Sequence, residues 1–493
     1  MDNSKSEYRS IFKATAFLSG VQVFNIIIGI IRNKIVSMIL GPSGMGIVGL
    51  LQSTSQTVNG FTNCGIPTSS VKNIAQAYER QEKTLLGKVV YIVKRLTTIA
   101  GSLAVMVMLA LSPKLSQWSF GNDDFTLSFV CLSISLLFTQ LTNAHIVIIK
   151  GCRRLKYYAK ANIFGNLLSL IIAVPLYYTF GKGAIVPVLV LVSLSTFLLA
   201  FFYEKKLGIT DIKPSSDEFK VISKDILKMG IPYAYSEIFP IIASYLIRIH
   251  VSGMGGVAEV GLYSAGFAIL NGYVGMIFTA MSSDFVPRLS AIIDDNKACE
   301  RAINSQIILS LLILFPILLL LIALSEFVVW VLYSSDFLQM TGMMCWGAIG
   351  MLFRTNSWCN GNLLVPKREV LFYWISAIAS AAVYLVSSLW LYNVYGVTGL
   401  GLAFLFSQLF DSVGILIYVR IRYSITMDKS IYLMTIVFTA VLVLMLLCNV
   451  FYPHNVFCYV TEAIVIALAI VYSLLKLNKI MDIRGFLKAK FKK

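Results

Sequence analysis

The stretch that decides the fold runs from Phe24 to Gly49, FNIIIGIIRNKIVSMILGPSGMGIVG. It contains the apolar runs of two membrane-spanning helices, and the Gly-Pro-Ser-Gly sequence from Gly41 to Gly44 predicts a tight turn between them. Arg32, Asn33 and Lys34 interrupt the apolar residues of the first helix. A charged side chain at the bilayer centre costs about 2.5 to 3.5 kcal/mol on insertion scales, so these two cations indicate a function.

Composition places the whole chain in the membrane. Of the 493 residues, 57% are hydrophobic and only 13% are charged, and the mean hydropathy is +0.79. These values exclude a water-soluble globular protein. Apolar segments long enough to cross a hydrocarbon core of about 30 Å recur along the chain and predict an all-α polytopic membrane protein with about fourteen transmembrane helices. The predicted ranges are 14–40, 44–66, 94–112, 124–149, 158–180, 184–203, 226–251, 259–285, 303–332, 338–361, 370–392, 397–420, 430–452 and 456–476.

The distribution of charge predicts the orientation. A net charge of +17 could indicate a nucleic-acid partner, but most of the 41 Lys and Arg residues fall in alternate loops, such as 150–160, and in the tail at 488–493. Loops rich in Lys and Arg stay in the cytoplasm, so both termini are predicted to be cytoplasmic. We therefore expect membrane lipids as partners and no nucleic acid.

The cysteines and histidines predict no cofactor and no metal site. The eight cysteines lie mostly within predicted spans and contain no CxxC pair, and there are only three histidines. Neither zinc ligation nor a disulfide framework is indicated, and the cysteines are interpreted as small buried apolar residues.

A break in composition and an internal repeat divide the chain. Residues 1–207 are predicted to form a first lobe of six helices, 208–225 a cytoplasmic linker, 226–422 a second lobe of six helices, and 423–493 two appended helices with a basic tail. Val48-Gly49-Leu50 with Asn59-Gly60 recurs as Val260-Gly261-Leu262 with Asn271-Gly272, and glycine turns and basic loops recur at offsets of about 215 and 210 residues. These matches predict two lobes related by a pseudo-two-fold axis along the membrane normal. The turn at 41–44 would then form one half of an outer gate.

The second predicted helix has a row of amides. Gln52, Gln56, Asn59 and Asn63 are spaced by four, three and four residues, so they share one helical face. Two interpretations fit equally well. The amides could hold neighbouring helices together by hydrogen bonds, or they could line a wet cavity that holds a sugar.

The basic residues within spans are candidate ligands for an anion, because guanidinium groups bind phosphate well. Arg32 lies deeper than Lys34, and about 200° of helix rotation separates them, so both cannot face one cavity. Extension toward a headgroup is as good an explanation for Lys34 and competes for Arg248 and Arg354. The predicted substrate-binding residues are Arg32, Lys34, Gln52, Gln56, Asn59, Asn63, Arg248 and Arg354.

The acidic residues within spans are candidates for ion coupling or for a structural pair with a membrane arginine. Glu237 and Asp411 form this set, and the structural pair is slightly favoured for Asp411. The first six predicted spans contain no acid, so Arg32 and Lys34 are expected to have no carboxylate partner in their own lobe. His145 is interpreted as a packed side chain rather than a proton relay.

The opening of the chain resembles a known family. NKIVSMILGPSGMGIVGLLQ (33–52), followed by GFTNCGIPTSSVKNIAQ (60–76), resembles the opening hairpin of Wzx-type O-antigen and enterobacterial-common-antigen flippases of the multidrug/oligosaccharidyl-lipid/polysaccharide (MOP) exporter superfamily. The resemblance covers about residues 10–422. Twelve spans are usual in such flippases, so the appended pair is a departure.

The resemblance implies a non-enzymatic protein of the bacterial inner membrane. By alternating access, it would move an undecaprenyl-pyrophosphate-linked oligosaccharide repeat unit from the cytoplasmic to the periplasmic leaflet. It also implies a polysaccharide polymerase and a chain-length regulator as further partners. In the related lipid II flippases, an arginine in a GxxR stretch of the first helix lines a cationic cavity, and Gly29 to Arg32 matches that stretch.

Three other classes of protein share some of these features. A flippase for lipid II or another lipid-linked glycan differs mainly in the headgroup, which the sequence does not decide. A MATE-like ion-coupled multidrug exporter usually carries cations, and the cations in the first lobe argue against it. A membrane polymerase or ligase needs a large outer loop with catalytic groups, whereas the outer loops here are short. No phosphate-binding GxxxxGK[ST] sequence is present, so the chain is not itself an ATPase.

Overall fold

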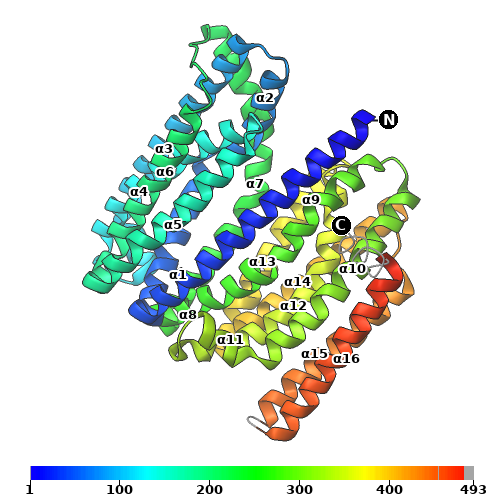
Figure 1. The fold of residues 1–493 in the computed structure, drawn as a ribbon. Helices are drawn as coiled ribbons and strands as arrows, with labels where there is room; N and C mark the ends of the chain where they lie inside the picture. Colours follow the sequence, from blue (N-terminus) through cyan, green and yellow to red (C-terminus); the bar gives the residue numbers. More distant parts are fainter. Residues whose placement is uncertain (1, 453–454, 482–493) are drawn as a thin grey trace. The chain divides into compact units, whose positions relative to one another are not determined.

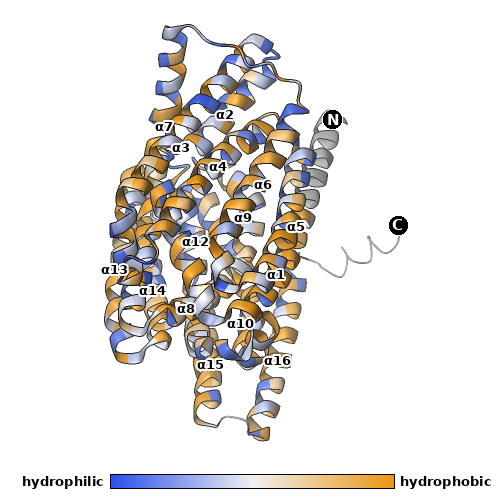
Figure 2. Ribbon diagram, turned by 90° about the vertical axis from the view of Figure 1, so that its left-hand side faces the viewer, coloured by the Kyte–Doolittle hydropathy of each residue, from blue (hydrophilic) through white to orange (hydrophobic). Residues whose placement is uncertain are grey.

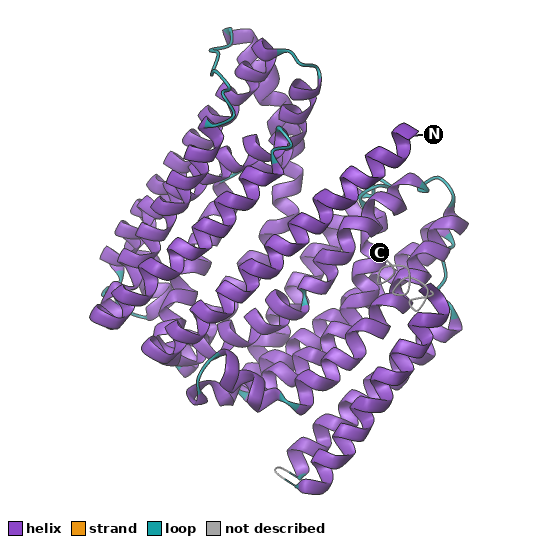
Figure 3. Ribbon diagram, in the orientation of Figure 1, coloured by secondary structure: helices purple, strands orange, loops and turns teal. Residues whose placement is uncertain are grey.

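The computed structural model describes residues 2–452 and 455–481, and these residues are helical almost throughout, without a strand (Figure 3). Apolar residues cover most of the length of the helices (Figure 2). The predicted all-α polytopic membrane fold is confirmed. The chain forms two compact units, which are described separately (Figure 1).

The first unit comprises Met1–Ser264 and Leu332–Asp336. Its helices are α1 (Asp2–Thr62), α2 (Ile66–Glu79), α3 (Lys83–Phe120), α4 (Thr126–Gly151), α5 (Leu155–Phe180), the 3-10 helix η1 (Gly181–Ala184), α6 (Ile185–Lys205), α7 (Ser216–Gly255) and the first part of α8 (Val257–Phe267). Helices α3, α4, α5 and α6 pack together with α1. Leu51, Met108 and Phe129 are fully buried in their shared core.

The second unit comprises Ala265–Val331 and Phe337–Lys493. Its elements are the end of α8, the π-helix η2 (Ala268–Val274), α9 (Met276–Ala291), α10 (Asn296–Ala323), α11 (Ser325–Leu332), the 3-10 helix η3 (Ser335–Met340), α12 (Thr341–Leu364), α13 (Val370–Tyr395), α14 (Val397–Tyr423), α15 (Lys429–Phe451) and α16 (Val456–Met481). Helix α12 lies at the centre and packs against α10, α14 and α15.

The helices long and apolar enough to span a membrane number eleven in the described residues, against about fourteen predicted. Two predicted pairs of spans run together, as Gly20–Thr62 and as Leu155–Lys205, because helical structure continues through their turns. Helix α12, predicted at 338–361, is too polar to qualify. Most of its residues are buried by protein, so it does not need a lipid-facing apolar surface. The span predicted at 303–332 is divided, because α10 ends at Ala323 and the short α11 follows.

The predicted turn after the first span is present at Gly41. This residue has φ 64° and ψ −174°, which are not helical, and divides α1 into two arms. The left-handed φ favours glycine, and Pro42 cannot donate a backbone hydrogen bond. In Figure 1 the first arm descends from the N-terminus and α2, which follows the second arm, lies at the top of the unit again.

Backbone angles confirm the internal repeat. Residues with positive φ recur at an offset of about 215 residues, and such angles are rare for residues other than glycine. The pairs are Gly41 (φ 64°, ψ −174°) with Gly256 (φ 83°, ψ 172°), Gly181 (φ 55°, ψ −132°) with Gly396 (φ 58°, ψ −142°), and Arg153 (φ 55°) with Arg368 (φ 61°). The last pair corrects the offset of about 210 predicted for the basic loops, because the two left-handed arginines fix their alignment.

A reciprocal contact joins two equivalent segments of the repeat. A Cβ atom on Gly46 would lie 1.8 Å from the carbonyl oxygen of Val257, and a Cβ on Gly261 would lie 2.0 Å from that of Pro42. Gly46 corresponds to Gly261 in the repeat, and Pro42 to Val257. A two-fold axis produces such an exchange of partners, so these segments meet as a pseudo-symmetric pair.

The compact units do not follow the predicted lobe boundary at 208–225. Helix α7 belongs to the first unit because it packs against α1, α2 and α3. Its start is fixed by a capping box, in which Ser215 Oγ accepts a hydrogen bond from the Glu218 backbone, and by a 2.6 Å ion pair between Lys88 and Glu218. Lys88 and Ser215 also hold the pKa of the exposed Glu218 carboxyl below its usual value.

Candidate functional site

Arg32 lies on the first arm of α1 and is half-buried. Its Nη1 donates a hydrogen bond to Ser169 Oγ on α5 at 3.2 Å. Arg32 has no salt bridge among the described residues. A guanidinium group has five N–H donors, so most of its capacity to bind an anion is unused by this contact.

Lys34 lies on the same arm but has a different partner. Its Nζ donates a hydrogen bond to the backbone carbonyl of Tyr333, a residue that is fully buried. This contact belongs to the first unit, which includes Leu332–Asp336. Neither extension to a headgroup nor ligand binding describes it. A ligand role for Lys34 stays a prediction and would require this contact to break.

The row of amides on the second arm of α1 divides into two parts. Gln52 and Gln56 are exposed, whereas Asn59 and Asn63 are half-buried. Asn59 Oδ1 accepts a 2.6 Å hydrogen bond from Gln140 on α4, as the first interpretation expects. Asn63 Oδ1 accepts a 2.8 Å hydrogen bond from the backbone N–H of Gly65, just after the end of α1. The amide oxygens of Asn59 and Asn63 are thus used within the protein, whereas Gln52 and Gln56 are the exposed members of the row.

Arg248 on α7 contacts residues close to it in sequence. Its Nη1 donates to the Ser244 carbonyl at 3.0 Å and also to the Ser244 hydroxyl. Its guanidinium lies 5.0 Å from the centre of the Tyr263 ring, within range of a cation–π interaction. Glu237, on the same helix, is exposed and begins the apolar segment Glu237–Gly255. The two residues therefore do not act as a pair.

The repeat relates Arg248 to Arg32. Arg32 precedes the turn glycine Gly41 by nine residues, and Arg248 precedes the equivalent Gly256 by eight. The two arginines thus lie at nearly the same depth below equivalent turns. One residue of helix rotates a side chain by about 100°, so they do not point in equivalent directions.

In the second unit, Arg354 and Asp411 lie on the packed helices α12 and α14. Arg354 Nη1 donates to Asn271 Oδ1 at 2.5 Å, and Asp411 Oδ1 accepts a 2.7 Å hydrogen bond from Ser380. They form no direct salt bridge among the described residues, but their charges interact over a longer distance, so the structural pair stays a prediction.

The contact of Asn271 repeats that of Asn59. In each repeat an asparagine amide accepts a hydrogen bond from a long side chain, Gln140 on α4 or Arg354 on α12. The offsets of both partners match the internal repeat to within a few residues. The second lobe thus has a cation, Arg354, where the first has an amide, Gln140.

The sequence did not predict a buried ionic cluster that forms around Glu204. Glu204 is 3% exposed, and its carboxylate lies 3.1 Å from Lys94 Nζ and 3.5 Å from His145 Nδ1. Glu204 belongs to α6, because the helix continues past the predicted span to Lys205. The sixth span was therefore predicted too short at 184–203, and the helix that forms it does contain an acid. Glu204 is not a partner of Arg32 or Lys34, because its carboxylate contacts Lys94 and His145 instead.

Replacing Glu204 with glutamine is expected to lower the free energy of unfolding by about 3 kcal/mol. This is the low end of the cost of removing one partner from a buried ion pair, because Asp211 still contacts Lys94 at 3.0 Å. Asp211→Asn is the matched control. Asp211 is 40% exposed, so its loss should cost less than about 1 kcal/mol. Equal denaturation curves in detergent for both variants would contradict the burial of this cluster.

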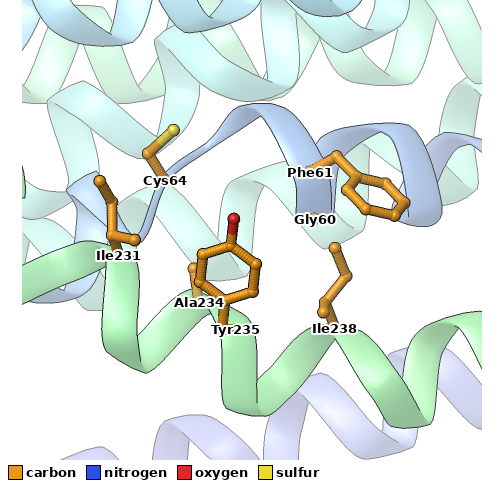
Figure 4. Close-up of a pocket in the computed structure, with 7 residues that line it drawn as sticks. All are labelled: Gly60, Phe61, Cys64, Ile231, Ala234, Tyr235 and Ile238. Carbon is orange, nitrogen blue, oxygen red and sulfur yellow. The ribbon is translucent and has the colours of Figure 1, made fainter.

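A small cavity of about 100 Å³ lies between the second arm of α1 and α7 (Figure 4). The residues that line it are mainly apolar, namely Gly60, Phe61, Cys64, Ile231, Ala234, Tyr235 and Ile238. It includes none of the predicted site residues, although Asn59 and Asn63 adjoin its wall in sequence. At this size it does not hold a lipid-linked oligosaccharide.

The duplicated all-helical fold is that of membrane transporters of the MOP superfamily. Solved structures share this fold. A lipid II flippase, MurJ, in an inward closed conformation matches with a TM-score of 0.69 and 13% identity over 94% of this chain and 99% of that one. An inward-facing multidrug resistance MATE family transporter of the MOP superfamily matches with a TM-score of 0.68 and 16% identity over 82% and 94%.

The family follows from the sequence model. A model described as polysaccharide biosynthesis protein matches residues 35–342, so the chain belongs to this family. The Lipid III flippase of Escherichia coli (strain K12) is 21% identical over 406 residues, which are 80% of this chain and 95% of the relative. The matched proteins are flippases and transporters rather than enzymes. The fold that the resemblance to the MOP superfamily implies is confirmed.

Proposed function

We propose that the protein is a flippase that moves a lipid-linked oligosaccharide across the bacterial inner membrane, with both termini in the cytoplasm. The observation that carries this proposal is Arg32, a half-buried cation within an apolar helix that hydrogen-bonds a serine and forms no salt bridge among the described residues. A cation kept without a carboxylate partner suits an anionic ligand, and arginine binds phosphate especially well. The likeness to a Lipid III flippase over 95% of that protein supports the same class.

For the finer substrate, we propose an undecaprenyl-pyrophosphate-linked O-antigen repeat unit. Arg32 would contact the pyrophosphate, and the exposed amides of Gln52 and Gln56 would contact the sugar. An amide inside a membrane span is costly against lipid and therefore suits a wet surface. Alternating access would carry the headgroup through the protein while the lipid tail stays in the bilayer.

The other basic residues have secondary places in this proposal. Lys34, Arg248 and Arg354 each have a protein partner, so each would bind the anion only after exchanging that partner. Glu237 and Asp411 remain candidates for ion coupling, and Asn59 and Asn63 support the helix rather than the substrate. Arg32 is therefore the first residue to test.

A second candidate is the flipping of lipid II. The fold match with the lipid II flippase covers 94% of this chain, which is possible only if it includes part of residues 423–493. The match to that fold therefore extends into the appended helices, whereas the resemblance to Wzx-type proteins ends near residue 422. This extent of the match favours lipid II as the alternative substrate.

Complementation separates the two candidates. A strain without its O-antigen flippase is expected to recover surface polymer when it carries this gene, and to lose its internal store of lipid-linked repeat units. A second strain, depleted of its lipid II flippase, should remain inviable with the same plasmid. Rescue of the second strain alone would replace the O-antigen proposal with lipid II. Rescue of neither, with the protein present in the membrane, would contradict both.

A further inference from the structure

The two C-terminal helices form an antiparallel hairpin whose register can be followed from contact to contact. Near its open end, Lys476 Nζ lies 3.7 Å from Met434 Sδ. About one turn further, the rings of Phe438 and Tyr472 meet edge to face at 6.3 Å. The members of each pair are nearly equidistant in sequence from the connection at 452–455. Residues placed symmetrically about that connection therefore face each other.

Two cysteines come together at the closed end of the hairpin, about one helical turn out of this register. Cys448 lies on the last turn of α15 and Cys458 on the first turn of α16. Cys458 Sγ is 3.9 Å from the carbonyl oxygen of Cys448, and the two thiols are within hydrogen-bonding reach of each other. Cys458 is 5% exposed and Cys448 is half-buried. The hairpin thus holds two facing thiols next to its connection.

We propose that Cys448 and Cys458 form a disulfide bond that closes the tip of this hairpin in the cell. The inference rests on the proposed orientation. With a cytoplasmic N-terminus, α15 is the thirteenth span of the sequence and runs outward, so the tip faces the periplasm. Disulfides form and persist in that oxidising compartment, whereas thiols on the cytoplasmic side stay reduced. The sequence spacing alone had suggested no disulfide.

The bond would form by thiol–disulfide exchange with a periplasmic protein disulfide as oxidant. The thiolate of Cys448, the more exposed of the two, attacks one sulfur of the oxidant and releases the other as a thiolate. The thiolate of Cys458 then attacks Cys448 Sγ in the mixed disulfide and expels the remaining oxidant thiolate. The two cysteines lose two electrons and two protons, and the oxidant is reduced to its dithiol.

Counting thiols tests the bond in the intact protein. Cells are quenched in acid, the protein is denatured, and free thiols are labelled with maleimide–polyethylene glycol before or after reduction. The chain has eight cysteines. We expect six labels before reduction and two more after it. Cys448→Ser and Cys458→Ser are the controls, and each should carry seven labels under both conditions. Eight labels on the unreduced wild-type protein would overturn the proposal.

A second arm tells which premise has failed. Purified wild-type protein in detergent is treated with diamide, which oxidises facing thiols regardless of membrane side. If both thiols are free in cells but diamide oxidises them together in the purified protein, the tip lies in the cytoplasm and the proposed orientation is overturned. Thiols that resist diamide would overturn the facing geometry. Neither result depends on transport, so complementation can succeed or fail independently.

Discussion

Replacing Arg32 with alanine is expected to abolish surface polymer in the complemented strain while the protein stays at normal abundance. A hydrogen bond to a charged group is worth about 1.5 to 3 kcal/mol, and each 1.4 kcal/mol is tenfold in affinity, so losing one such contact weakens anion binding roughly 10- to 100-fold. Arg32→Lys should keep part of the activity, because it keeps the charge but loses the planar fork that matches phosphate. Surface polymer and trapped lipid-linked repeat units are the two readouts.

Ser169→Ala is the matched control for Arg32. It removes the contact that Arg32 makes at 3.2 Å and leaves the guanidinium in place. We expect transport close to that of the wild type, because the arginine then loses a positioning contact but none of its charge. Full surface display with Arg32→Ala would remove the central claim. Loss of display with both variants would indicate that the α1–α5 contact, rather than the cation, is required.

The fold was predictable where a local signal decides it. Long apolar runs mark most of the spans, because lipid requires an apolar surface. Gly41 marks the first turn, since a left-handed φ favours glycine. The repeat was visible in a few glycines for the same reason. Helix α12 shows the limit of hydropathy, because a helix surrounded by protein has no need to be apolar.

The partners of the polar residues were not predictable from local sequence. Hydropathy ends the sixth span at the first charged residue and so assigns Glu204 to a loop. Its burial depends on Lys94 and His145, which lie far away in sequence on α3 and α4. Asn59 likewise bonds to Gln140 on α4. Helical spacing places residues on one face, but it does not say which helix covers that face.

The first lobe also shows why a buried acid need not serve a membrane cation. Glu204 is a buried acid of this lobe, but its carboxylate contacts Lys94 and His145. Arg32 contacts a neutral serine instead. A buried ion pair contributes little net stability once desolvation is counted, whereas an unpaired cation in a span is costly. The proposed anionic substrate would supply the missing charge during transport.

Replacing Gly46 with alanine is expected to destabilise the protein by about 3 kcal/mol or more. The new Cβ would lie 1.8 Å from the Val257 carbonyl oxygen, which is backbone and cannot rotate away. Adding a methyl group to a well-packed site typically costs 1 to 3 kcal/mol, and a backbone neighbour places this site at the upper end. Gly29→Ala is the control, because no atom lies within 4 Å of its new Cβ. Thermal unfolding in detergent and membrane abundance measure both variants.

The pseudo-symmetry makes this prediction stricter. A Cβ on Gly261 would lie 2.0 Å from the Pro42 carbonyl oxygen, so Gly261→Ala tests the same contact from its other side. The contact of Gly46 with Val257 and the contact of Gly261 with Pro42 are equivalent in the repeat. The two variants should therefore lose similar amounts of stability. A normal unfolding temperature for both would contradict the close approach of these segments. A different result is that both variants accumulate normally and only transport fails. This result would indicate that the contact acts as the proposed outer gate, because the added methyl group would then separate the two segments without unfolding either lobe.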